Sequence, residues 1–166
     1  MQPDRVDEIV GQWHRERPDL DVSGMEIIGR ISRIERLLRQ RLDTTFGRHG
    51  LESWEFDVLA TLRRSGAPYR LTPGDLLDSM MITSGAMTNR IDRLQARSFV
   101  ERTRHPDDGR QVLVALTAAG LDTIEAAVAD HTDNELQIVG SLGSRQQAQL
   151  VDLLRTLHLA LAAHDD

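Results

Sequence analysis

The sequence predicts a mainly helical fold with one small β hairpin. Over most of the chain, apolar residues recur at the three- and four-residue spacing that places them on one helix face. Residues 99–105 and 111–116 break this pattern and read as two strands joined by the tight turn Asp107-Asp108-Gly109-Arg110. With 166 residues, 40% of them hydrophobic and 28% charged, the chain can bury one good core.

Three helices are predicted in the N-terminal part of the chain. The first covers residues 4–16 and is ended by Pro18. The second is long, from residue 22 to about 48, with Ser23 as N-cap and Glu26 completing a capping box. The third covers roughly residues 53–64. The apolar stripe of the long helix consists of Ile27, Ile28, Ile31, Ile34, Leu37, Leu38 and Leu42.

A helix-turn-helix is predicted between residues 72 and 97. Thr72, Pro73 and Asp75 supply a hydroxyl N-cap, a proline at the first helical position and an acid at the third, so a short helix starts here and ends near residue 80. After a tight turn, Thr83 or Ser84 caps the next helix, which runs to about residue 97. Followed by the two predicted strands, this arrangement is a winged helix-turn-helix.

The remaining elements complete the chain as one compact unit. Period-two spacing predicts that Val112, Val114 and Leu116 share one face of the second wing strand. Thr117 caps a long helix over residues 118–139, and Ser144 caps a last one over residues 145–163. The organisation is therefore N-terminal helices (1–48), the winged helix-turn-helix (49–117) and C-terminal helices (118–166).

The terminal helices carry more apolar surface than a small DNA-binding core can cover. Soluble proteins avoid exposing such surface, so the N- and C-terminal helices are expected to form a two-fold homodimer interface. The dimer would present two recognition helices to a pseudo-palindromic site on double-stranded DNA, about one helical turn apart.

The helix over residues 84–97 has the side chains of a recognition helix. Short and hydroxyl residues let a helix enter a major groove deeply, and Asn or Arg can contact base edges at two points. Arg93 is predicted to contact phosphate, or otherwise to pair with Asp92 or Glu101. Arg110 at the wing tip would reach a minor groove, and Asp108 would brace the wing through an arginine such as Arg104. The predicted DNA-binding residues are Thr83, Ser84, Ala86, Thr88, Asn89, Arg90, Arg93, Arg104, Asp108 and Arg110.

The distribution of charge agrees with a central DNA-facing module. The whole chain carries a net charge of −6, but residues 30–110 hold fifteen Arg and eleven acidic residues, giving +4. The segments before and after carry −4 and −6. A positive middle between acidic ends would keep the peripheral helices away from phosphates, although a chance fluctuation of surface charge would give the same count.

Several function classes are disfavoured. The chain has no Cys, which excludes a thiol redox switch, and its six His are scattered without metal-binding spacing. No membrane span or signal peptide is evident, so a cytoplasmic protein without a cofactor is expected. No nucleophile elbow, phosphate loop or paired-carboxylate motif points to an enzyme. A regulator that acts only through protein partners remains an alternative, against which the arginine-bearing wing argues.

The wing segment resembles the MarR family of transcriptional regulators. The family pattern of Asp, any residue, Arg, three residues, Val, any residue, Leu-Thr stands here as Asp108, Arg110, Val114, Leu116 and Thr117. Upstream, SGAMTNRIDRLQARSFVERT is similar to the family's recognition helix and first wing strand, and the likeness covers roughly residues 25–163. The resemblance implies a dimeric winged-helix regulator, usually a repressor, that a small molecule often releases from DNA.

The added N-terminal helix, with the stretch WHRERPDLD followed by the long helix, resembles the urate-responsive branch of that family. The resemblance implies a ligand site of Trp13, Asp57, Arg90 and Arg102. Arginine suits an oxidised purine anion and tryptophan can stack on a flat ring, so the effector would be urate, a xanthine-like purine or another small aromatic anion. Each residue also has a structural alternative: Trp13 as a packing anchor, and the others as members of ion pairs or phosphate contacts.

Overall fold

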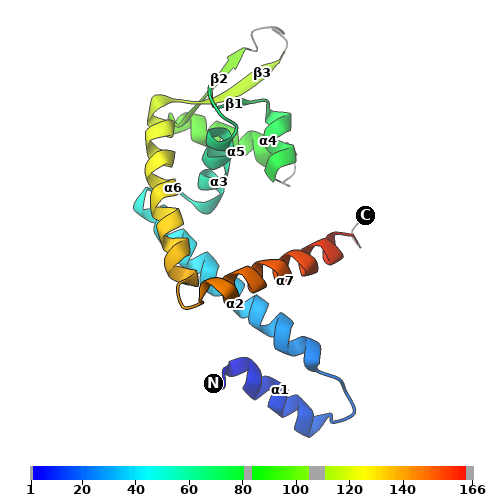
Figure 1. Ribbon diagram of the computed structural model, residues 1–166. Helices are drawn as coiled ribbons and strands as arrows, with labels where there is room; N and C mark the ends of the chain where they lie inside the picture. The colour runs from blue at the N-terminus through cyan, green and yellow to red at the C-terminus, as the bar shows by residue number, and fades with distance from the viewer. Residues whose placement is uncertain (1, 81–83, 105–110, 164–166) are drawn as a thin grey trace.

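The computed structural model describes residues 2–80, 84–104 and 111–163, which form seven helices and one small sheet (Figure 1). The long helix α2 (Ser23–Arg48) runs through the molecule, with α1 (Arg5–Glu16) at one end and the winged helix-turn-helix at the other. Helix α6 (Ala118–Val139) lies along the second half of α2. The predicted fold class, mainly helical with a β wing, is confirmed. No described helix is both long and apolar enough to cross a bilayer.

Helix α1 begins with a capping box. The side chain of Asp4 accepts from the backbone N–H groups of Val6 (2.7 Å) and Asp7 (3.1 Å), and Asp7 in turn accepts from the backbone of Asp4 (2.7 Å). Arg30 on α2 donates to Asp4 (3.0 Å) and Asp7 (2.6 Å), so the start of α1 is tied to α2. The two helices also share a small core of Val6, Val10 and Val22.

The start of α2 differs from the prediction. Ser23 is the first helical residue rather than the N-cap, and Val22 occupies the cap without a side-chain hydrogen bond. The backbone N–H of Ser23 donates to Asp21 Oδ1 at 3.0 Å, so a carboxylate two residues earlier, and not the Ser23 hydroxyl, accepts from the first turn of the helix.

The winged helix-turn-helix unit is built on α3 (Ser53–Arg64), α4 (Pro73–Met80) and α5 (Ser84–Ala96). The predicted start of α4 is confirmed: Thr72 Oγ1 accepts from the backbone of Asp75 (3.1 Å), and the Asp75 carboxylate accepts from that of Thr72 (3.2 Å). All three helices contribute to one core with α2, α6 and the sheet. Its buried side chains include Phe46, Phe56, Val58, Leu59, Leu62, Leu76, Met87, Ile91, Leu94, Val100, Val114 and Ile124.

The sheet has three antiparallel strands in the order β1-β3-β2: β1 (Arg70–Leu71), β2 (Val100–Arg104) and β3 (Val112–Leu116). The two wing strands pair with Arg102 opposite Val114. The sequence did not predict β1, which makes β3 a central strand. Three consecutive β3 residues, 113–115, are therefore buried, and Val112 is exposed. Val112, Val114 and Leu116 share one face as predicted, because β3 pairs regularly with β2, but Leu113 and Ala115 on the other face are buried as well.

The C-terminal helices are α6 and α7 (Ser144–Ala162). Thr117 caps α6 as predicted, accepting from the backbone of Gly120 at 3.0 Å. Ser144 was predicted as the cap of α7, but it is the first helical residue. Gly143 is the cap, and its backbone N–H donates to Gln146 Oε1 at 2.9 Å.

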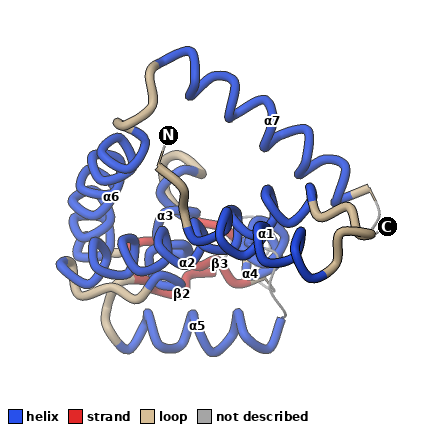
Figure 2. The backbone as a smooth tube through the Cα atoms, turned by 90° about the horizontal axis from the view of Figure 1, so that it is seen from below, coloured by secondary structure: helices blue, strands red, loops and turns tan. Residues whose placement is uncertain are grey.

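Helix α7 projects away from the rest of the chain (Figure 1), and in Figure 2 it lies at the edge opposite α5. None of its described residues is buried. Exposed large apolar residues gather on α7 and along α2. They are Ile27, Ile28, Ile34, Leu37, Leu150, Val151, Leu153, Leu154, Leu159 and Leu161.

Candidate nucleic-acid interface

The outer face of α5 carries short polar side chains. Met87, Ile91 and Leu94 are buried on the inner face, which fixes how the helix is turned. Ala86, Thr88 and Asn89 are consequently exposed on the outside. Of the other predicted contacts, Ser84 begins α5, and Thr83, Asp108 and Arg110 lie outside the described residues.

Two arginines of α5 lie over the ring of Trp54 on α3. The guanidinium carbon of Arg93 is 4.6 Å from the ring centroid, and that of Arg90 is 5.6 Å away, both within cation–π range. Arg93 Nη2 also donates to Glu52 Oε1 at 2.5 Å. The partner of Arg93 is therefore Glu52, and the predicted pairing with Asp92 or Glu101 was wrong.

An ion pair with a buried carboxylate joins α3 to Arg97, the residue that follows α5. Arg97 Nη1 donates to Glu55 Oε2 at 2.5 Å, and the side chain of Glu55 is only 1% exposed. Arg97 also donates to the carbonyl of Gly50 (2.9 Å) and lies 4.6 Å from the ring centroid of Phe99. The sequence did not predict this pair, although a glutamate at the third position of a capping box was a local signal for Glu55.

Arg102 is held on the opposite flank of α5. Its guanidinium donates to Asp92 (2.5 Å) and to the side-chain oxygen of Gln95. With 3.6 residues per turn, positions 92 and 95 lie roughly opposite position 90 around the helix axis. Arg102 thus connects β2 to α5, away from Arg90. Arg104 is exposed at the end of β2.

Asp57 and Arg90 are close enough to interact electrostatically. Partial desolvation on α3 raises the pKa of Asp57, and the electrostatic influence of Arg90, then of Arg64 and His131, opposes this shift. Trp13 is 40% exposed on α1, at the end of α2 remote from α3 and α5 (Figure 1). Within one chain, the structure brings Asp57 and Arg90 together and leaves Trp13 and Arg102 apart from them.

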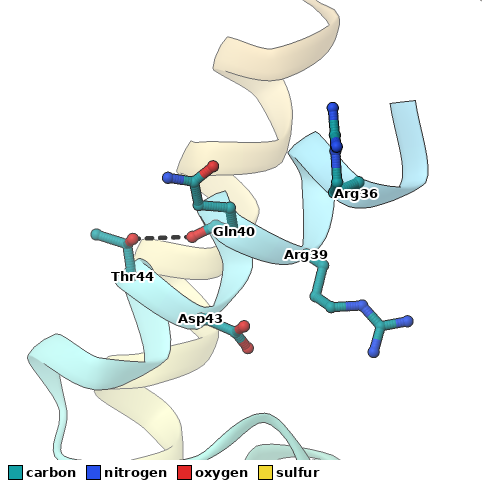
Figure 3. A pocket seen from close by; sticks show the side chains of 5 residues that line it. All are labelled: Arg36, Arg39, Gln40, Asp43 and Thr44. Atoms are coloured by element: carbon teal, nitrogen blue, oxygen red, sulfur yellow. Dashed lines mark hydrogen bonds between the residues drawn. The ribbon is translucent and has the colours of Figure 1, made fainter. Parts of the chain in front are cut away.

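A surface hollow of 510 Å³ lies on α2, lined by Arg36, Arg39, Gln40, Asp43 and Thr44 (Figure 3). Thr44 Oγ1 donates to the carbonyl of Gln40 at 2.8 Å, an ordinary bond within the helix. All five residues belong to one helix, so the hollow lacks the second wall that an enclosed ligand site has. Among the described residues, no group of His, Asp and Glu is arranged to hold a metal ion.

The fold and the outward face of α5 define a winged helix-turn-helix DNA-binding protein. Comparison with known sequences gives the family. Residues 49–111 match the family profile described as "MarR family". The chain is 40% identical over 149 residues to the HTH-type transcriptional regulator PecS of Dickeya dadantii, covering 90% of each chain. It belongs to the MarR family and is a DNA-binding transcriptional regulator, not an enzyme.

Solved structures support the same fold. A mutant of MarR from E. coli, complexed with operator DNA, superposes with a TM-score of 0.70 at 26% identity, covering 83% of this chain and 99% of that one. AbsC, a MarR family regulator from Streptomyces coelicolor, gives a TM-score of 0.75 at 20% identity, covering 87% of this chain and 98% of that one.

Proposed function

We propose that the protein is a ligand-responsive repressor that binds a pseudo-palindromic operator as a homodimer and is released by a small aromatic anion, with urate as the first candidate. The observation that carries the operator contact is the outer face of α5, where Ala86, Thr88 and Asn89 are exposed above a buried apolar face. Such a helix fits a major groove, and the similar E. coli protein was crystallised on operator DNA.

The exposed apolar side chains of α2 and α7 support the dimer. Ile27 is 61% exposed, Leu153 69% and Leu161 60%, and they lie on helices that a second copy could cover. Apolar surface of this extent is costly in water, and a two-fold interface would bury it. Sedimentation at micromolar concentration should therefore give a dimer, and a monomer there would refute this part of the proposal.

The electrostatic influence of Arg90 on Asp57 supports the effector site. Arg90 is on the recognition helix and Asp57 is on the helix behind it, so an anion that attracts Arg90 would alter how α5 sits against α3. For such a ligand to release DNA, it must bind the DNA-incompetent arrangement more tightly than the other. Trp13 would stack on the ligand from α1, and within this proposal a second copy has to supply it, because its own α1 is remote.

The test is fluorescence anisotropy of a duplex from the gene's upstream region, titrated with protein and then with urate. Salt-sensitive binding that urate reverses is expected, and Asp57→Asn should weaken the response to urate. Asp78→Asn is the matched control, since Asp78 is an exposed carboxylate on α4. If urate does not change operator binding, urate is not the effector, and a different phenolic or aromatic effector, or none, is favoured.

The wing is tested in the same assay. Arg110→Ala is expected to weaken operator binding with little change in sequence preference, because a minor-groove arginine reads groove shape. Unchanged affinity at several salt concentrations would refute the assignment of Arg110.

A further inference from the structure

Helix α3 presents a small site to the arginines of the recognition helix. Trp54, at the start of α3, is half-buried, and its ring lies beneath both Arg90 and Arg93. The two arginines are three residues apart on α5 and so project from the same side of that helix. One aromatic ring therefore contacts two cations of the DNA-binding helix.

Glu52 fixes the ring and one of the cations together. Trp54 Nε1 donates to Glu52 Oε2 at 2.8 Å, and Arg93 Nη2 donates to Glu52 Oε1. These two bonds, the tryptophan bond first, hold the pKa of the Glu52 carboxyl below its usual value. Glu52 is thus ionised near neutral pH and engages both of its oxygens. We call Glu52 and Trp54 the arginine dock.

The arginine dock differs in burial from the ion pair one turn along. The side chains of Arg93 and Glu52 are 52% and 57% exposed, whereas the carboxylate that binds Arg97 is 1% exposed. Removing Arg97 would leave the buried carboxylate of Glu55 without its counter-charge, so that pair is structural. An exposed pair is weak and its members can exchange partners, because water and other ions compensate both charges.

We propose that Glu52 and Trp54 are positioning residues for DNA binding, and that Arg93 exchanges between this dock in the free protein and a phosphate of the operator in the complex. Both acceptors are anions and a single guanidinium is available, so binding to one competes with binding to the other. Arg93 is exposed on α5, the helix assigned to the groove, and needs only a rotamer change to leave Glu52. The dock then sets part of the affinity for DNA.

The first test substitutes Glu52→Gln, which keeps an oxygen to accept from Trp54 and removes the charge. The proposal predicts that operator binding tightens about two- to five-fold, the range for losing one exposed ion pair. Glu101→Gln is the matched control, since it removes an exposed carboxylate from β2 of the same unit without touching the dock. It should tighten binding less than Glu52→Gln does.

A double-mutant cycle isolates Arg93. Arg93→Ala should weaken binding and lower the slope of log K against log salt by about 0.9, the value for one phosphate contact. Adding Glu52→Gln to Arg93→Ala should then bring no gain beyond that of Glu101→Gln. A gain that persists without Arg93, or weaker binding by Glu52→Gln alone, would overturn the proposal.

The fluorescence of Trp54 gives an independent readout. The chain has two Trp, so Trp13→Phe leaves Trp54 as the only one. Saturation with operator DNA should change its emission as Arg93 leaves the ring, and Arg93→Ala should remove most of that change. Emission from Trp54 that does not respond to operator would refute the exchange. The result is separable from the proposed effector, because no step of this test contains urate.

Discussion

Gly120 lies where the start of α6 touches the turn between α5 and β2, and a methyl group there would collide with backbone. A Cβ built on Gly120 would lie 1.9 Å from the carbonyl oxygen of Phe99 and 2.9 Å from its carbonyl carbon. Thr117 caps α6 at the same place, and its own N–H donates to the Phe99 carbonyl at 3.1 Å. Gly120→Ala must therefore push the start of α6 away from Phe99.

The expected cost follows from these contacts. Forcing a group into a packed site costs about 1–3 kcal/mol, and disturbing a hydroxyl N-cap costs about 0.5–2 kcal/mol. Alanine regains about 0.5–1 kcal/mol because it is a better helix former than glycine. The free energy of unfolding should thus fall by about 2–3 kcal/mol for Gly120→Ala.

Urea unfolding at one fixed protein concentration measures this change, since an oligomer's stability depends on concentration. Gly47→Ala is the matched control: Gly47 is helical, and nothing lies within 4 Å of a Cβ placed there. It should be neutral or stabilise the protein by up to about 1 kcal/mol. If Gly120→Ala is as stable as Gly47→Ala, the close approach of α6 to Phe99 is refuted.

Three further predictions concern other contacts. Arg97→Ala should lower the free energy of unfolding by about 3 kcal/mol, because it leaves the carboxylate of Glu55 buried without its partner; urea unfolding that shows a loss below about 1 kcal/mol would contradict this. The pKa of Asp57 is raised in the folded protein, so its ionisation opposes folding. The free energy of unfolding falls as pH rises from the unfolded to the folded pKa, and the loss is complete above the folded pKa. Asp57→Asn should therefore raise the melting temperature near neutral pH more than it does in acid, and the opposite order in calorimetry would refute the argument. Gly29→Val should loosen α1, because a Cβ at Gly29 already comes within 3.1 Å of Val6; hydrogen exchange of residues 5–16 should become faster, and unchanged exchange would show that α1 tolerates the side chain.

Local signals predicted the helices well because their causes lie within a few residues of each other. Thr72 with Asp75, and Thr117 with the backbone of Gly120, form caps between positions three apart, which the sequence displays directly. The caps assigned to Ser23 and Ser144 were wrong by one residue, since a nearby side chain supplied the acceptor in each case. Composition ranks residues as caps but does not choose among neighbours.

Contacts between distant residues could not be predicted in the same way. β1 is two residues long, too short for any periodicity, yet it changes β3 from an edge strand to a central one. The partner of Arg93 is 41 residues away, at the start of α3, and several acids closer in sequence were equally plausible. The prediction that Asp57 and Arg90 share a site came from the family resemblance, and no pattern in the residues themselves indicated that they interact.

These contacts change the meaning of the positive central segment. Residues 30–110 carry a charge of +4, but Arg93, Arg97 and Arg102 are each paired with a carboxylate in the free protein. The three ion pairs differ in the free energy needed to break them. The pair with the buried carboxylate holds α5 in place, and the arginines of the two exposed pairs can exchange partners. Net charge therefore draws the protein toward DNA, while among these three paired arginines only those whose ion pairs are open to water can exchange a carboxylate for a phosphate. The affinity of this regulator for its operator then depends on which ion pairs it can break. At the arginine dock, the single substitution Glu52→Gln removes one such pair and frees Arg93 for phosphate.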